Sequence, residues 1–283
     1  MTRLLACIDD SRYTQSVLDH AAWAALQLRA GVELLHVLER HPERAGATDF
    51  SGSIGVDASK TLLAELAALD ERRGKLAMAQ GRQLLDAATA HLVEQGLDAG
   101  SRLRHGELVD VLDAEPGDRA LLVLGKRGVH ADFAKLHLGS RLERVLRTST
   151  QPILVASRAF QPIRRVLVAF DGSDSARKVV ELVARSPLTS GLECHVVMAA
   201  TDDADNRSRI AWAEAVLREN HVGCQTHVLP GDASKVLPAY VESHDIHLLA
   251  MGAHGHSRMR ELLLGSTTIT LIRRCLLPVL VVR

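Results

Sequence analysis

Three glycines and a run of hydroxyl side chains follow one of the apolar segments near the end of the sequence. The segment "GAHGHSRMRELLLGSTT", residues 252–268, spaces its glycines as G-x2-G-x9-G and continues with Ser266 and Thr267. Glycine allows a ligand to approach the backbone closely because it has no Cβ. Hydroxyl groups and the free N–H groups of a helix N-terminus can both bind anions. This spacing therefore predicts a loop that wraps a phosphate-bearing ligand.

An altered copy of this motif, "GKRGVHADFAKLHLGS", occupies residues 125–140. Its spacer between the second and third glycines has ten residues instead of nine, and Lys126 and Arg127 separate its first two glycines. Upstream, Asp10 stands where the second copy has Gly172. A carboxylate near a polyanion opposes binding, whereas the two basic side chains favour it. We therefore expect the second copy to be the stronger site, and the sequence leaves open whether the first binds a ligand at all.

The two motifs belong to a duplication of the whole chain. "RLLACIDDS" at residues 3–11 matches "RVLVAFDGS" at residues 165–173, and three further blocks match in the same order. Repeated blocks in a fixed order indicate repeated structural units. We interpret the 283-residue chain as two tandem domains, 1–158 and 159–283, with an insertion at about 40–75 in the first.

The insertion accounts for about 35 extra residues in the first copy. It begins rich in Gly, Ser and Asp, which predicts a loop, and continues from about Ser59 with a composition that predicts a helix. Two interpretations remain open at this point, a helical extension of a connection and a mobile lid or partner-binding segment.

Apolar strands and helical segments alternate within each copy, a pattern that predicts a parallel sheet covered on both faces. The expected fold class is α/β, with two tandem Rossmann-like domains that each contain a five-stranded parallel sheet flanked by helices. The expected strands are Leu4–Ile8, Val32–Leu38, Ser101–Arg104, Ala120–Leu124, Ile153–Ala156, Val166–Phe170, Glu193–Met198, Gln225–Leu229, His247–Met251 and Val279–Val282. In such sheets ligands bind beyond the carboxyl ends of the strands, which is where Gly252 falls.

The composition narrows the classes of partner and compartment. Lys+Arg and Asp+Glu number 34 each, so the chain has no overall charge that would attract nucleic acid or an anionic membrane. The four cysteines have no paired spacing, which suits a reducing environment rather than a disulfide framework. No secretory signal and no apolar run of about 18 residues is evident. We expect a cytoplasmic protein without nucleic-acid or membrane partners.

The Asp-Gly-Ser at residues 171–173, the G-x2-G-x9-G-S motif and the closing "PVLVV" strand together resemble the universal stress protein family. The resemblance covers the chain twice, as in the tandem two-domain members of that family. It implies a sheet of the adenine nucleotide alpha hydrolase-like type. It also implies binding of ATP, with or without Mg²⁺, in members that keep the glycine motif, and a role in the stress response or in signalling.

The resemblance carries over to individual positions of this sequence. In the second domain it implies a ligand bound by Ala169, Asp171, Val197, Gly252, Gly255, Gly265, Ser266 and Thr267. The corresponding weaker candidates in the first domain are Asp9, Val37, Gly125, Gly128, Gly139 and Ser140.

Motifs of other nucleotide-dependent enzymes are missing from the sequence. "DGSDSARK" and "DDSRYTQS" follow the first strands where a dinucleotide-binding enzyme would carry G-x-G-x-x-G, and G-x4-G-K-[ST] is absent. We find no catalytic constellation and no metal site, since His254 and His256 lack further ligands at a telling spacing. We therefore expect a binding protein rather than an enzyme. A slow ATPase and a nucleotide-independent or lipid-binding interaction module remain alternatives.

The closing strands "PILVAS" and "PVLVV" are apolar and would form exposed sheet edges if left unpaired. We expect them to pack together, so that the two domains form a pseudo-dimer within one chain. A further homodimer is compatible with this arrangement but not required by it.

Overall fold

The computed structural model describes residues 2–38, 56–114, 119–126, 140–254 and 264–283. The first half contains β1 (Arg3–Cys7), α1 (Thr14–Leu28), β2 (Gly31–Leu38), α2 (Val56–Glu94), β3 (Ala99–His105), α3 (Leu108–Ala114), β4 (Arg119–Gly125), α4 (Ser140–Thr148) and β5 (Ile153–Ala156). The second half contains β6 (Arg165–Ala169), α5 (Asp174–Arg185), the 3-10 helix η2 (Pro187–Thr189), β7 (Glu193–Ala199), α6 (Ala204–Glu219), β8 (Cys224–Leu229), α7 (Ala233–Ser243), β9 (Leu248–Gly252), α8 (Ser266–Arg274) and β10 (Val279–Val282). Every expected strand is present, with ends that differ by at most two residues.

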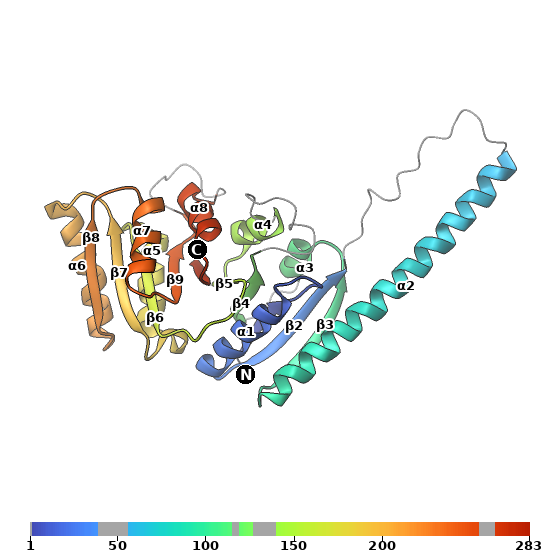
Figure 1. The fold of residues 1–283 in the computed structure, drawn as a ribbon, viewed down its shortest axis with the longest axis horizontal. Coiled ribbons are helices and arrows are strands. Elements are labelled where there is room, and N and C mark those ends of the chain that lie inside the picture. The colour runs from blue at the N-terminus through green and yellow to red at the C-terminus, as the bar shows by residue number, and fades with distance from the viewer. Residues whose placement is uncertain (1, 39–55, 115–118, 127–139, 255–263) are drawn as a thin grey trace.

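The strands form one ten-stranded sheet with the order β3-β2-β1-β4-β5-β10-β9-β6-β7-β8, as can be followed in Figure 1. All neighbours within each half are parallel, whereas β5 and β10 pair antiparallel with Leu154 opposite Leu280. The two expected five-stranded parallel sheets and their contact through the closing strands are therefore confirmed. Because the strands of the two halves run in opposite directions, the carboxyl ends of the first five strands and those of the last five lie at opposite ends of the sheet, measured along the strands.

Helices cover both faces of this sheet. Buried side chains of α1, α5, α6 and the last turns of α2 form one apolar cluster on one face. Those of α3, α4, α7 and α8 form a second cluster on the other face. Strand residues that alternate between the faces contribute to both clusters, which explains the near-continuous apolar runs in the sequence. Within the described parts of the chain, none of the helices combines the length and the apolar character that a membrane crossing needs.

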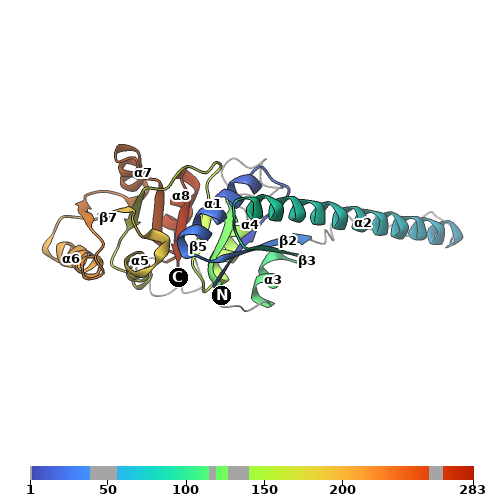
Figure 2. The same ribbon diagram turned by 90° about the horizontal axis from the view of Figure 1, so that it is seen from below.

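The insertion expected at about 40–75 continues as a single helix of 39 residues, α2. Its last turns pack on the sheet through Leu85, Ala88 and Leu92. Every residue from 64 to 76 is exposed, and Figure 2 shows this part of the helix extending away from the rest of the molecule. The helix begins at Val56, three residues before the start expected from the sequence.

Side chains also join the two halves beside the β5–β10 pair. The Nζ of Lys126, at the end of β4, donates hydrogen bonds to the carbonyl oxygens of Cys275 and of Leu277, the latter at 3.1 Å. Arg273 of α8 forms an ion pair with Glu143 of α4 at 3.4 Å. Lys126 therefore contributes to the contact between the halves.

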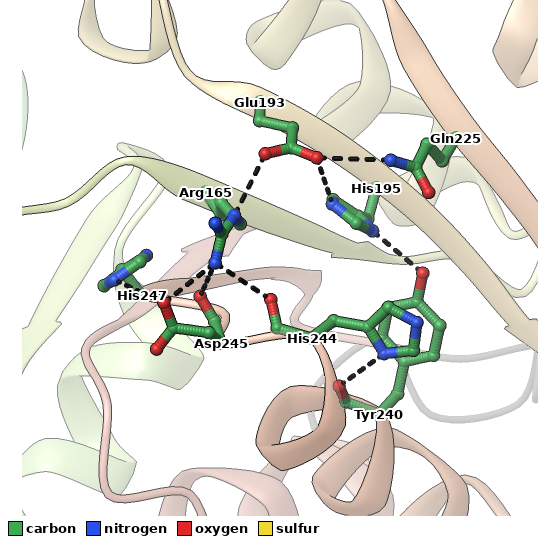
Figure 3. Close-up of polar contacts among 8 residues, drawn as sticks. All are labelled: Arg165, Glu193, His195, Gln225, Tyr240, His244, Asp245 and His247. Atoms are coloured by element: carbon green, nitrogen blue, oxygen red, sulfur yellow. Dashed lines mark hydrogen bonds and ion pairs between the residues drawn. The ribbon is translucent and has the colours of Figure 1, made fainter.

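A polar network crosses the amino ends of the second-half strands (Figure 3). Arg165 donates hydrogen bonds to the carboxylates of Glu193 at 2.9 Å and Asp245 at 2.8 Å. The ring of His195 contacts the Tyr240 hydroxyl through Nδ1 at 2.8 Å and a Glu193 carboxylate oxygen through Nε2 at 3.3 Å. This network ties α7, which carries Tyr240, to β7, which carries His195.

Burial lowers the pKa of His195, and the nearby His244 and His227 lower it further, whereas Glu193 acts in the opposite direction. Burial likewise lowers the pKa of His20 in α1. A histidine whose folded-state pKa lies below its unfolded value of about 6.5 binds protons more weakly in the native state. Its contribution to stability is complete above about pH 6.5 and is lost as the pH falls through the folded-state pKa.

We therefore expect the free energy of unfolding to decrease between about pH 7 and pH 5, and His195→Gln to reduce this dependence. A single histidine contributes a slope of at most about 1.4 kcal/mol per pH unit. Urea unfolding at several pH values measures the slope, with His105→Gln on the exposed end of β3 as the control. A slope identical in the His195→Gln variant and the parent would contradict this assignment.

Candidate functional site

A cavity of about 490 Å³ opens at the carboxyl ends of the second-half strands. The strands β6, β7 and β9 form its floor, and α7 and α8 form its walls. Its lining consists of Ala169, Phe170, Asp171, Ser173, Val197, Ala199, Ala233, Leu237, Met251, Gly252, His254, Leu264, Gly265, Ser266, Thr267, Thr268 and Leu271. The position agrees with the general rule for ligand sites in open parallel sheets.

One side of the cavity is apolar. Ala169, Val197 and Met251 lie within the last three residues of three neighbouring strands there, and Leu237 and Leu271 come from α7 and α8. The Val197 carbonyl accepts a hydrogen bond from the Phe170 N–H at 3.0 Å, so its backbone already takes part in the sheet. A surface of this kind suits a flat, largely apolar ring.

The opposite side is formed by the N-terminus of α8. Gly265 is the N-cap residue, and it provides no side-chain cap for the first turn. The N–H groups at the start of a helix have no intrahelical partners and carry the positive end of the helix dipole. The exposed hydroxyl side chains of Ser266 and Thr267 lie beside them. This side can therefore accept an anion.

Thr268 fixes this helix end against the strand that precedes the loop. Its Oγ1 donates a hydrogen bond to the Gly252 carbonyl at 3.1 Å, and the side chain is buried. The Gly265 N–H donates to the Ala253 carbonyl at 3.1 Å. The two ends of the loop are thus held together by contacts among described residues.

The Asp-Gly-Ser segment at the end of β6 builds the start of α5. An Asp171 carboxylate oxygen accepts a hydrogen bond from the Ser173 N–H at 2.9 Å, and Ser173 caps the helix by accepting from the Ala176 N–H at 3.3 Å. Gly172 has a φ of +81°, a conformation that favours glycine. This turn leaves Asp171 lining the cavity.

The first half has a different turn at this point. Asp10 is exposed and is not among the described residues with positive φ. The helix α1 begins after Tyr13, and its N-cap has no side-chain hydrogen bond. Exposure of Asp10 also weakens the charge repulsion predicted from the sequence, because water screens it.

Gly252 has a structural reason to be glycine. A Cβ at this position would lie 2.2 Å from the Ser175 Oγ and 3.1 Å from the Ala176 backbone nitrogen. The strand β9 and the first turn of α5 therefore approach too closely for a side chain. The φ of Gly265 is −59°, so its backbone conformation does not require glycine.

The structure brings together most of the residues predicted for the second site. Ala169, Asp171, Val197, Gly252, Gly265, Ser266 and Thr267 all line the cavity, whereas Gly255 lies outside the described residues. In the first half, Asp9, Val37 and Gly125 lie at or just beyond the carboxyl ends of β1, β2 and β4. Gly128 and Gly139 lie outside the described residues, and Ser140 begins α4. Lys126, predicted as a basic side chain favouring phosphate, donates to carbonyl groups of the other half.

Several lining residues escaped the sequence analysis. Ala233 and Leu237 come from α7, which no glycine motif marks. Their helical spacing predicts a buried face but not which cavity that face closes. Phe170 and Met251 adjoin predicted residues and could have been included as neighbours.

A metal site gains no support from the described side chains, among which no group of three His, Cys, Asp or Glu is arranged to hold a metal ion. His254 lines the cavity, and its carbonyl accepts hydrogen bonds from the hydroxyl groups of Ser173 and Ser175. His256, the second histidine of the H-x-H pair, lies outside the described residues.

Comparison with known proteins shows which family and which solved structures this chain is similar to. The family model described as "Universal stress protein family" matches residues 1–157 and again residues 162–283. A universal stress protein of Synechocystis sp. is 36% identical over 287 residues, with 100% of both chains covered. The crystal structure of a universal stress protein from Archaeoglobus fulgidus has a TM-score of 0.67 at 23% identity and covers 99% of this chain and 98% of that one. The first two comparisons concern ancestry, and the third concerns the fold alone.

The close approach at Gly252 leads to a prediction about stability. Gly252→Ala should destabilise the protein by about 1–3 kcal/mol, because the new methyl group overlaps the side chain of Ser175. The penalty should shrink in a Ser175→Gly background, as measured by a double-mutant cycle of chemical unfolding. Gly223→Ala is the control, since nothing lies within 4 Å of a Cβ there. Equal penalties in both backgrounds would show that Ser175 does not impose the glycine.

Proposed function

The chain belongs to the universal stress protein family, and from this premise we propose that its second half binds an adenine nucleotide, ATP above all, in the cavity beside α8. The observation that carries the proposal is the helix N-terminus without a side-chain cap, which opens on the same cavity as an apolar strand floor. A nucleotide has the matching polarity, with a flat ring at one end and anionic phosphates at the other. The cavity volume lies within the usual range of small-molecule sites.

Each part of the ligand has a chemically suitable neighbour. The adenine would lie on the apolar side among Ala169, Val197 and Leu237. Asp171 would accept hydrogen bonds from ribose hydroxyl groups, because a carboxylate is an acceptor. The phosphates would lie at the first turn of α8, beside Ser266 and Thr267, where the N–H groups point outward.

The charge of the phosphates needs compensation. The described residues of the lining include no Lys or Arg, so the helix N-terminus is the main positive group among them. Arg258 and Arg260 occur in the intervening loop sequence, outside the described residues. A Mg²⁺ ion bound with ATP would supply further positive charge, since hard cations prefer carboxylate and phosphate oxygens.

We propose a binding module that acts in the cytoplasm in the stress response or in signalling. All four cysteines are free thiols, which agrees with a reducing compartment. Asp171 is the one carboxylate among the described lining residues, and it already accepts the Ser173 N–H. Because this carboxylate is already engaged, we favour a binding protein over an enzyme. The alternatives are slow ATP hydrolysis and a nucleotide-independent or lipid-binding interaction module.

We expect one strong ATP site per chain, in the second half. Gly265→Val should weaken ATP binding more than tenfold, because a branched side chain would enter the cavity where the phosphates lie. Its negative φ is accessible to valine, so the fold should tolerate the change. Isothermal titration with Mg-ATP measures the effect, and Gly139→Val at the corresponding glycine of the first half is the matched control. If only Gly139→Val abolishes binding, the sites are assigned the wrong way round.

We also expect ATP to remain intact over many binding cycles. Steady-state release of inorganic phosphate should stay below about one per second, the lower end of typical enzyme turnover. At saturating ATP, Asp171→Asn should leave this background rate unchanged, because the carboxylate is assigned to ribose binding and not to a chemical step. A faster rate that Asp171→Asn abolishes would favour the ATPase alternative.

A further inference from the structure

The projecting part of α2 is a helix without support from the rest of the described chain. Residues 64–76 are all exposed, and among the described side chains of the helix those that pack on the sheet belong to its last turns (Figure 2). Isolated helical segments of this length are marginal in water. Gly74 lies within the segment, and a Cβ there would meet nothing within 4 Å, so no close contact requires this poor helix former. A partner would therefore stabilise the segment.

An apolar stripe runs along the projecting segment. Leu66, Leu69 and Leu76 have exposed fractions of 46%, 43% and 64%. Their separations of three and seven residues place them at the a, d and next d positions of a heptad repeat. Arg73 takes the remaining a position, with its guanidinium 3.9 Å from the Asp70 carboxylate. A stripe of this kind is the surface through which helices pair in coiled coils.

We propose that the projecting segment pairs with the same segment of a second copy of this chain, as an antiparallel coiled coil. Charges beside the stripe select this partner and this direction. Glu65 and Arg72 both occupy g positions. In an antiparallel pair with Leu66 opposite Leu69 of the second copy, these two leucines form the central layers, Leu76 lies beyond them, and g positions face one another. Glu65 then meets Arg72 of the second copy, and the two-fold axis generates the same pair again.

A parallel pair would be opposed by the same charges. In that arrangement g positions face the e positions of the partner, so Glu65 would meet Asp70 of the second copy. Two carboxylates in facing positions repel each other. The direction of pairing thus follows from the sequence of one short segment.

The rest of the fold is consistent with this surface for association. The strands β5 and β10 already pair within the chain and are not available as sheet edges. The insertion occurs in the first half alone, so each chain presents one such helix. Two identical helices related by a two-fold axis form a closed dimer without risk of further growth.

Exchange of the charged residues beside the stripe tests the proposal. We expect a concentration-dependent dimer of the 30.7 kDa chain in sedimentation equilibrium. Glu65→Arg and Arg72→Glu should each weaken dimerisation at least tenfold, and the double variant should restore it. Glu71→Lys and Lys75→Glu provide matched controls, because this ion pair lies away from the stripe, with 2.7 Å between its charged atoms. Leu66→Glu with Leu69→Glu should leave only the monomer.

Several outcomes would overturn the proposal. Glu65→Arg would strengthen a parallel dimer by meeting Asp70 of the second copy, so a tighter dimer excludes the antiparallel arrangement. A dimer that survives both leucine changes uses another surface. A monomer at all concentrations, with leucine changes that increase proteolysis of α2, indicates cover by the chain's own residues. Stripe-dependent binding of the monomer to phosphatidylcholine–phosphatidylglycerol vesicles indicates a membrane surface instead.

Discussion

The antiparallel contact between β5 and β10 is the interaction on which the rest of this structure depends. Each strand has only four residues, all of them buried, and Leu154 faces Leu280 at the centre. Either half alone would expose such a strand as an apolar edge open to association. Pairing removes both edges at once and fuses two parallel sheets into one. Because the contact is antiparallel, the strands of the two halves have their carboxyl ends at opposite ends of the sheet. Ligand sites in the two halves would therefore lie far apart.

The residues that directly follow β4 and β9 make different contacts in the two copies. The carboxyl end of β4 in the first half lies beside the segment that leads into β10, where Lys126 contacts carbonyl groups. The equivalent residue of the second half is Ala253, which is buried and whose N–H donates to the Val282 carbonyl. The second half also keeps a capped α5 and a glycine at positive φ after its first strand, whereas the first half has neither at the start of α1. Local substitutions after the strands therefore make the two copies differ in their contacts, although the strands of both copies are arranged in the same way.

The fold was predictable from the sequence because its determinants are local. Apolar runs at regular spacing identify strands, and a repeat of such runs identifies the two halves, without knowledge of any long-range contact. Tertiary packing decides which residues line the candidate site, and this was harder to predict from the sequence. Gly252 is explained by the approach of Ser175, 77 positions earlier in the chain, and Leu237 reaches the cavity from a helix with no motif.

The cysteines illustrate the same limit. Their spacing in the sequence shows no pairing, yet Cys194 and Cys224 are direct neighbours on β7 and β8. Burial raises the pKa of Cys194 to about 12 and raises that of Cys224 as well. Since the thiolate is the reactive form, burial disfavours reaction at both neighbouring thiols. A sequence pattern can thus miss a neighbour, and the neighbour can still be without chemical consequence.

Duplication explains how one chain can hold features with conflicting demands. A nucleotide cavity needs rigid strand ends and a helix start held by buried contacts such as that of Thr268. A long projecting helix needs the opposite, an element that leaves the core and exposes apolar side chains. In a single domain, an insertion after the second strand would adjoin the cavity that the strand ends form. In the tandem chain the insertion follows β2, while the described cavity lies at the carboxyl ends of β6, β7 and β9 on the other edge of the sheet. The shared β5–β10 contact connects the two features without requiring either to adapt to the other.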